Sequence, residues 1–181
     1  MEKQGFTTTL TVDQSPEEVF AAINNVRGWW SGEIEGHTDK LGSEFSYRYR
    51  DIHRSRQKVT ELISAKRIVW HVTDADLGSF KNVREWIGTD IIFEMGRVGG
   101  KTELRFTHVG LVPAFECYGD CSGAWGALVG TNLRNLITTG KNQWTCLRRR
   151  ASRPHLVRQT ISANEPSRET KRKTRRREKK Q

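Results

Sequence analysis

The 181-residue sequence contains no run of about 18 consecutive apolar residues, the length that a membrane-spanning helix needs. Its N-terminus, Met1–Gly5, carries neither a basic segment followed by a hydrophobic stretch nor a small-residue cleavage site, so it predicts no export signal. Cysteine is scarce, and the odd number of three predicts reduced thiols rather than a framework of disulfides. These absences predict a cytoplasmic protein without a membrane span.

Glycine is absent and acidic residues are scarce at the C-terminal end of the chain. Residues 141–181 hold 15 Lys and Arg against 3 Asp and Glu, whereas residues 1–140 hold 16 against 18 and contain all 16 glycines. The formal net charge of +10 therefore comes from the C-terminal segment. We expect one globular domain over residues 1–140 and a basic tail over residues 141–181, which is disordered because it has too little apolar surface to offset chain entropy.

The first elements are a strand and a short helix. Phe6, Leu10 and Val12 fall on one face of a Thr-rich segment, the alternation of a half-buried strand. Ser15 and Glu18 then form the pattern of a capping box, with Pro16 between them at the first helical position. This pattern predicts a helix from Pro16 to about Val26.

A series of further segments alternates apolar and polar residues. No segment is followed by a helix of crossover length before residue 114, so the pattern predicts an antiparallel meander of about six strands with one apolar face. The apolar positions are Phe45, Tyr47 and Tyr49; Val59–Ile63; Ile68, Trp70 and Val72; Ile87, Ile91, Phe93 and Met95; and Leu104, Phe106 and His108.

A long helix is expected from about Ala114 to Thr139, because apolar residues recur there at helical spacing and Gly140 suits a left-handed cap. A second stripe on this helix consists of glycines at steps of four, three and four. Each glycine costs a helix about 1 kcal/mol relative to alanine. We therefore expect the glycine stripe to face the sheet, which would approach the helix backbone closely. Its members are Gly119, Gly123, Gly126 and Gly130.

The order of these elements predicts an α+β fold, and several motifs carry a resemblance to a known family. They are VDQSPEEVFAAINNVRGWW at 12–30, LG at 41–42, VTELISAKRIVWHV at 59–72, GTDIIFEM at 88–95, KTELRFTHVGL at 101–111 and AWG at 124–126. Over residues 6–140 the chain resembles the SRPBCC (START-like) superfamily, in the branch of the activator of heat-shock protein ATPase homologues. The resemblance implies a helix-grip fold, in which a curved antiparallel sheet of about six to seven strands wraps around a long C-terminal helix, with a short N-terminal helix beside it.

The main functional signal is a set of aromatic and apolar residues on inward-facing positions. Such a set can line a pocket for a hydrophobic or amphipathic small molecule, or it can simply fill the core. Trp29 and Trp30 are adjacent, and adjacent residues rarely face the same way, so we expect one of them to lie at an entrance. The candidate ligand-binding residues are Trp29, Trp30, Tyr47, Tyr49, Trp70, Phe93, Phe106, His108, Trp125 and Val129.

The sequence offers little for metal binding or catalysis. His108, Cys117 and Cys121 supply only three potential zinc ligands, and buried thiols are the simpler interpretation. No paired carboxylates, phosphate-binding loop or nucleophile elbow is recognisable, so we predict no metal, no cofactor and no catalytic residue. The prediction leans against an enzyme without excluding one, because some helix-grip relatives are enzymes whose catalytic residues form no transferable motif.

Three functions follow from these features. The leading hypothesis is non-enzymatic binding of a small hydrophobic or amphipathic molecule between the sheet and the C-terminal helix. The first alternative, implied by the resemblance, is a protein-interaction module that binds a heat-shock chaperone. The second is electrostatic binding of nucleic acid through the basic clusters of residues 148–180, where aromatic residues for base stacking are missing. An equally weighted alternative for this tail is an acquired extension without a selected function.

Overall fold

The computed structural model describes residues 4–141. The N-terminal strand β1 (Gly5–Val12) turns Leu10 and Val12 into the core and leaves Phe6 partly buried against it, as the alternation predicts. The expected basic tail and its nucleic-acid-binding segment lie outside the described residues, apart from Lys141. None of the helices within residues 4–141 is long and apolar enough to cross a membrane.

Helix α1 (Pro16–Asn24) begins with the capping box that the sequence predicts. Ser15 Oγ accepts a hydrogen bond from the Glu18 amide at 3.2 Å, and the Ser15 amide donates to Glu18 Oε2 at 2.7 Å. The helix ends at Asn24, slightly before the predicted Val26, and a 3₁₀-helix, η1 (Val26–Gly28), follows it. Both α1 and η1 pack apolar side chains against the sheet.

A single antiparallel sheet of seven strands forms the body of the domain, in the order β1-β7-β6-β5-β4-β3-β2. Strand β2 was not among the predicted elements, since only Ile34 of its four residues is buried and no alternation is visible. Ile87 was assigned to a strand, but it lies in the loop before β6 and is 39% exposed. The strands after β1 are β2 (Glu33–Gly36), β3 (Glu44–Tyr49), β4 (His53–Ile63), β5 (Arg67–Asp76), β6 (Asp90–Val98) and β7 (Lys101–Val109).

The C-terminal helix consists of α2 (Tyr118–Ala127), a π-helical turn η2 (Leu128–Leu133) and α3 (Arg134–Thr139). It ends at Gly140 in the left-handed conformation expected, with φ 68°. Its start at Tyr118 lies later than the predicted Ala114. The preceding residues form tight turns, in which the amides of Phe115 and Tyr118 donate to the carbonyls three residues before them.

The glycine stripe of this helix does not face the sheet, so that prediction is wrong. All four glycines are exposed, and an added Cβ atom at any of them would meet no atom within 4 Å. The opposite side of the helix carries the large residues that pack against the sheet, among them Trp125, Leu128 and Leu133. Burial of that side, rather than close backbone approach, offsets the low helix propensity of glycine.

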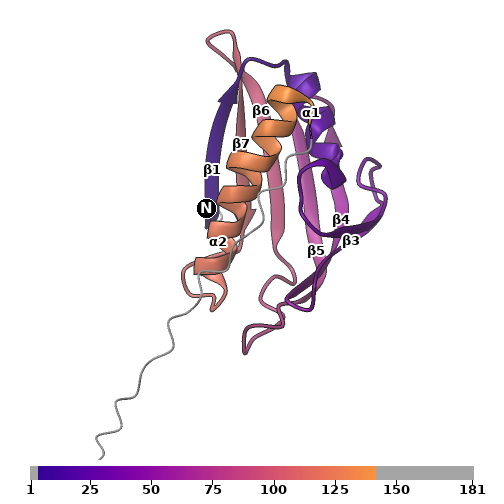
Figure 1. The fold of residues 1–181 in the computed structure, drawn as a ribbon, viewed down its shortest axis with the longest axis vertical. Coiled ribbons are helices and arrows are strands. Elements are labelled where there is room, and N and C mark those ends of the chain that lie inside the picture. The colour runs from indigo at the N-terminus through magenta and orange to yellow at the C-terminus, as the bar shows by residue number, and fades with distance from the viewer. Residues whose placement is uncertain (1–3, 142–181) are drawn as a thin grey trace, which may run out of the picture. The chain divides into compact units, whose positions relative to one another are not determined.

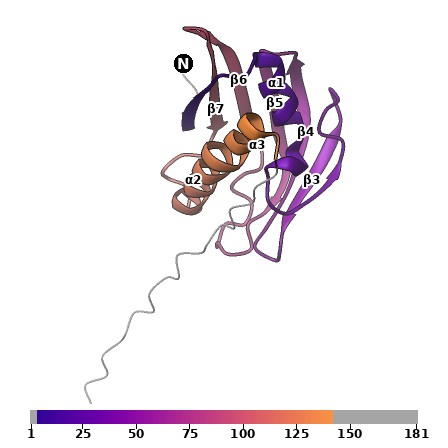
Figure 2. The ribbon, with the colours of Figure 1, turned by 45° about the horizontal axis from the view of Figure 1, so that its top comes forward.

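The helices lie together on one face of the sheet. Figure 1 shows the C-terminal helix running obliquely across this face, with α1 beside its C-terminal end. In Figure 2 the sheet curves around α2 and α3, which is the helix-grip arrangement. The space enclosed by the sheet and the C-terminal helix holds the domain's core.

Candidate functional site

The residues predicted to line a pocket converge on the space between the sheet and the C-terminal helix. Tyr49 is only half-buried, at the turn between β3 and β4, and the other nine are buried. Trp86, which the sequence analysis did not single out, is buried with them. We call the following set the aromatic interior: Trp29, Trp30, Tyr47, Trp70, Trp86, Phe93, Phe106, His108, Trp125 and Val129.

Stacked rings fill the centre of the aromatic interior. The ring of Trp30 lies nearly parallel to that of Trp70, with centroids 6.1 Å apart and an interplanar angle of 9°. The centroid of the Trp30 ring lies 4.4 Å from that of Tyr47 and 5.1 Å from that of Trp125 on the C-terminal helix. Tyr47 Oη donates to the Ser31 carbonyl at 2.9 Å, and burial raises the pKa of this phenol. Side chains, rather than an open channel, occupy this space.

Trp29 and Trp30 both point into the interior, so neither lies at an entrance as we expected. Their exposed fractions are 0% and 1%. The regular alternation of side chains fails here because Trp29 closes the 3₁₀-helix η1 with φ −140° and ψ −25°. Trp29 Nε1 also donates to the Ile23 carbonyl at 3.2 Å, which holds its ring against α1.

Trp86 enters the interior from the loop between β5 and β6. Its ring stacks on Trp125 at 5.8 Å, and its edge-to-face neighbours are His53 at 4.5 Å and His108 at 4.6 Å. Periodicity could not have revealed this residue, because the loop has no regular secondary structure. The available signal was a tryptophan in a connection that also holds other apolar residues, among them Leu77, Phe80 and Val83.

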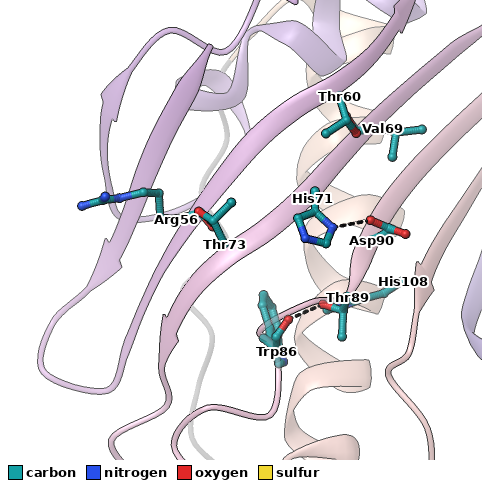
Figure 3. A network of polar contacts seen from close by, with 9 residues as sticks. All are labelled: Arg56, Thr60, Val69, His71, Thr73, Trp86, Thr89, Asp90 and His108. Atoms are coloured by element: carbon teal, nitrogen blue, oxygen red, sulfur yellow. Dashed lines mark hydrogen bonds and ion pairs between the residues drawn. The ribbon is translucent and has the colours of Figure 1, made fainter. Parts of the chain in front are cut away.

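A chain of three hydrogen bonds joins the helix, the sheet and this loop. Trp125 Nε1 donates to His108 Nδ1 at 3.0 Å, so the ring proton of a neutral His108 sits on Nε2. His108 Nε2 lies 2.9 Å from Thr89 Oγ1, which donates to the Trp86 carbonyl at 2.5 Å (Figure 3). Burial, and secondarily the nearby His53, lower the pKa of His108 to about 3, so the imidazole is neutral at pH 7.

A second polar row runs along the inner face of β4, where His53, Ser55 and Gln57 occupy alternate positions. Gln57 Nε2 donates to Ser55 Oγ at 2.6 Å, and His53 Nε2 lies 3.2 Å from the same hydroxyl. Burial lowers the pKa of His53 to about 4. The inner face of β4 is therefore polar but uncharged at neutral pH.

Three polar atoms inside this region have no hydrogen-bond partner among the described residues. They are Oε1 of Gln57 and Nε1 of Trp70, two residues with an exposed fraction of 0%, and Nε1 of Trp86, which is 3% exposed. Gln57 stands opposite Phe45 on β3 and Val72 on β5, so its neighbours across the sheet are apolar. A buried acceptor and a buried donor without partners each cost free energy.

Three connections meet at one end of the domain, the lower end in Figure 1: the β3–β4 turn, the loop 77–89 and the segment 110–117. Glu85 of the loop accepts hydrogen bonds from the amides of Glu116 and Cys117 at 2.8 and 2.9 Å. In return, Glu116 Oε2 accepts from the amides of Lys81 and Asn82 at 2.9 and 3.4 Å. This reciprocal carboxylate clamp holds the loop that carries Trp86 against the start of α2.

Residues 13–138 match the family model described as Activator of Hsp90 ATPase homolog 1-like protein. The chain belongs to this family. The resemblance expected from the sequence and the α+β helix-grip fold are thereby confirmed. The matched segment ends within the last turn of α3 and excludes the basic tail.

Several solved structures are similar to this chain in fold. The Aha1 dimer from Colwellia psychrerythraea shares 25% sequence identity over 76% of this chain and 98% of that one, with a TM-score of 0.61. MLL2253 from Mesorhizobium loti, at 15% identity, covers 74% and 98% with a TM-score of 0.58. CalU16 from Micromonospora echinospora, at 12%, covers 74% and 76% with a TM-score of 0.53. No curated protein matches the chain.

The outer face of the sheet in this family member carries ordinary surface pairs. His71 Nδ1 lies 2.8 Å from Asp90 Oδ1 (Figure 3), and the His71 side chain is 41% exposed.

Cys117 and Cys121 are free, buried thiols, and their mutual hydrogen bond together with burial raises the pKa of Cys121. Within residues 4–141 no group of His, Cys, Asp and Glu is arranged to hold a metal ion.

Two surface pockets flank the domain. One, of about 430 Å³, lies where α1 meets the β2–β3 loop and is lined by polar residues, including Asn24, Arg27 and His37. The other, of about 250 Å³, lies at the β3–β4 turn, and its lining residues are Arg48, Arg50, Asp51, His53, Arg54 and Asp76. The second pocket borders the aromatic interior, because His53 lines the pocket and its ring contacts Tyr47 and Trp86 of the interior.

Proposed function

We propose that this domain binds a small, flat, amphipathic molecule in the aromatic interior. The observation that carries the proposal is the pair of unpartnered buried atoms, Gln57 Oε1 and Trp70 Nε1, among aromatic rings. A ligand with one hydrogen-bond donor and one acceptor would give both atoms a partner. The apolar body of the ligand would replace contacts between two rings by contacts of similar strength between a ring and the ligand.

The rings are packed against one another, so a ligand has to displace a side chain. Trp86 is suited to this, because it lies on the loop between β5 and β6 and not on a strand or a helix. Outward movement of Trp86 would free the faces of His53 and Trp125 that it covers. The loop 77–89 would then act as the lid of the site.

Gln57→Leu is the variant that tests the proposal. Leucine removes the unpartnered oxygen and also the Nε2 donor to Ser55 Oγ, a hydroxyl that keeps His53 Nε2 at 3.2 Å as a partner. Because the buried acceptor without a partner is gone, the free protein should gain stability while losing a ligand contact. We expect its melting temperature to rise, and the thermal shift that fatty acids, flavonoids or polyketides give the wild type to disappear. Gln14→Leu is the matched control, because Gln14 Oε1 is also buried and unpartnered but lies outside the aromatic interior. The proposal fails if no apolar molecule stabilises the wild type, or if Gln57→Leu responds to the ligand as the wild type does.

A second candidate function is an interaction with a heat-shock chaperone of the Hsp90 type. The family match and the 25% identity to an Aha1 protein favour it. The outer face of β4 is the surface we propose for this contact, since Arg54, Arg56 and Lys58 lie there in an exposed row. Adding the protein to purified Hsp90 should raise its ATPase rate, and Arg56→Glu should reduce that effect where Gln57→Leu does not. An unchanged rate at equimolar protein rules this candidate out.

Nucleic-acid binding gains no support from the described surface. The basic row of β4 stands opposite acidic residues on both neighbouring strands: Lys58 opposite Glu44, Arg56 opposite Asp74, and Arg54 opposite Asp76. Binding through residues 148–180 stays a prediction. A chain truncated after Gly140 should then lose all RNA retention at low salt, and equal retention by the truncated chain would contradict it.

A further inference from the structure

The pocket at the β3–β4 turn shares a wall with the aromatic interior. One side of the half-buried His53 ring faces Tyr47 at 5.2 Å and Trp86 at 4.5 Å between centroids. The same residue lines the pocket of about 250 Å³ at this turn. A molecule seated where Trp86 now packs would thus have its nearest outlet beside His53, among the charged residues of the pocket.

The charges of this pocket leave one cation without a carboxylate. Arg48 pairs with Asp51 at 3.0 Å, and Arg54 pairs with Asp76 at 3.0 Å, so both acids of the lining are engaged. Arg50 forms no ion pair with any carboxylate in residues 4–141. Its guanidinium carbon lies 5.4 Å from the centroid of the Tyr49 ring, an arrangement that keeps the charge at the pocket.

The backbone of Arg50 is held in an unfavourable conformation. Its φ is 52°, in the left-handed region that costs a residue with a Cβ atom about 1 kcal/mol relative to glycine. The turn fixes this geometry, because the Ile52 amide donates to the Tyr49 carbonyl at 3.2 Å and Arg48 Nε donates to the Arg50 carbonyl at 3.3 Å. Glycine or asparagine would suit the position better, so the arginine lowers the stability of the turn.

We propose that the ligand of the aromatic interior is an organic acid, whose flat apolar body lies among the rings and whose anionic group reaches past His53 to Arg50. This inference rests on the proposed ligand-binding function and names the chemical class of the ligand. Arginine suits the role because its planar guanidinium can donate two parallel hydrogen bonds to a carboxylate or sulfonate. Arg48 and Arg54, already neutralised by Asp51 and Asp76, would shape the pocket and add little net charge.

A matched pair of fluorescent probes tests the charge requirement with the full chain. The anion 8-anilinonaphthalene-1-sulfonate and the uncharged N-phenyl-1-naphthylamine share one ring system and differ by the sulfonate. We expect the wild type to bind the anion about tenfold more tightly. Arg50→Gly should erase this difference without weakening the uncharged probe, and it should fold well because glycine suits the left-handed turn. Arg56→Gln, an exposed arginine on the same hairpin but outside the pocket, should keep the difference.

The possible results separate this inference from the function on which it rests. If both probes bind with equal affinity to the wild type, or if the preference for the anion persists in Arg50→Gly, the acid is not held by Arg50 and the inference is wrong. Binding in the aromatic interior would still stand in either case, provided that Gln57→Leu weakens the uncharged probe. If neither probe binds, the ligand-binding function fails together with the inference.

Discussion

Trp125 donates its indole N–H to Nδ1 of His108 over 3.0 Å, and this bond ties the C-terminal helix to β7 inside the core. Both residues are almost completely buried, so neither atom could find water if the other were removed. The bond also decides which nitrogen of His108 carries the proton, and through Thr89 it fixes the backbone of Trp86. The loop 77–89, the proposed lid, is therefore positioned both by packing and by polar contacts.

Trp125→Phe should destabilise the domain by more than the loss of ring contacts alone. Phenylalanine cannot donate to His108 Nδ1, and a buried acceptor left without a partner costs about 1–3 kcal/mol. Trp70→Phe is the matched control, because the Trp70 indole N–H has no partner to lose. Urea unfolding should show a free energy of unfolding lower by about 1–3 kcal/mol in Trp125→Phe than in Trp70→Phe. Equal losses would mean that the hydrogen bond contributes nothing.

Two histidines, the buried His108 and the half-buried His53, should make the domain sensitive to mild acid. Burial lowers the folded-state pKa of His108 from 6.5 to about 3, so the unfolded chain takes up the proton first as the pH falls. Stability should be complete above pH 6.5 and decline steadily below it, with about 2 kcal/mol lost through His108 between pH 6.5 and pH 5. His53 acts in the same direction, since burial lowers its pKa to about 4.

Urea unfolding at a series of pH values measures this effect. The variant His53→Gln should show a shallower decline, because one of the two titrating groups is gone. A free energy of unfolding that stays constant from pH 7 to pH 5 would contradict the assignment of neutral imidazoles to both positions.

The regular elements could be predicted because their signals are local. The capping box of Ser15 and Glu18, the alternation of β1 and the cap at Gly140 each depend on residues within a few positions, and the structure contains all three. The family resemblance then supplied the arrangement of these elements. Strand β2 escaped because a short edge strand with one buried residue carries no alternation.

The candidate site was only partly predictable, since its remaining parts depend on contacts between distant segments. Trp86 is placed by the Glu85–Glu116 clamp and by Thr89, none of which leaves a periodic pattern. The polar row of β4 was missed because Gln57 looks like an exposed residue when judged by type alone. The glycine stripe misled us for the opposite reason, because spacing does not reveal which side of a helix is buried.

The exposed glycines of the C-terminal helix should be sites of easy stabilisation. Replacing Gly119, Gly123 and Gly126 by alanine removes backbone entropy from the unfolded chain and meets no atom within 4 Å in the folded one. The triple variant should gain about 2 kcal/mol in its free energy of unfolding. Gly5→Ala should do the reverse, because its Cβ would overlap the backbone carbonyl oxygen of His108 and lie 2.8 Å from Val109 Cα, and neither backbone atom can move aside. A destabilised triple variant would show that the stripe contacts something other than solvent.

The carboxylate clamp should control the motion of the lid loop. Partial desolvation raises the pKa of Glu85, but the amide hydrogen bonds from Cys117 and Glu116 outweigh it and the pKa lies below its usual value. In Glu85→Gln the charge that strengthens these bonds is lost, so hydrogen exchange of the Glu116 and Cys117 amides should become about tenfold faster. Asp120→Asn, in the first turn of α2, is the control and should leave their exchange unchanged. Equal exchange rates of these amides in Glu85→Gln and Asp120→Asn would mean that the carboxylate clamp does not control the motion of the loop 77–89.

The π-helical turn η2 brings Asn132 to a position where it can hold Trp29. Asn132 is buried, and its Nδ2 donates to the Trp29 carbonyl at 3.1 Å. Asn132→Ala would leave this carbonyl without its donor and should lower the free energy of unfolding by about 1–3 kcal/mol. Asn135→Ala, one turn later and only half-buried, should change it by less than about 0.5 kcal/mol. Near-ultraviolet circular dichroism should report the release of Trp29 in Asn132→Ala alone, because Trp29 packs against Trp30 and Trp70 at 5.9 and 6.4 Å. An unchanged tryptophan spectrum in a destabilised Asn132→Ala would mean that the asparagine supports the helix and not the aromatic interior.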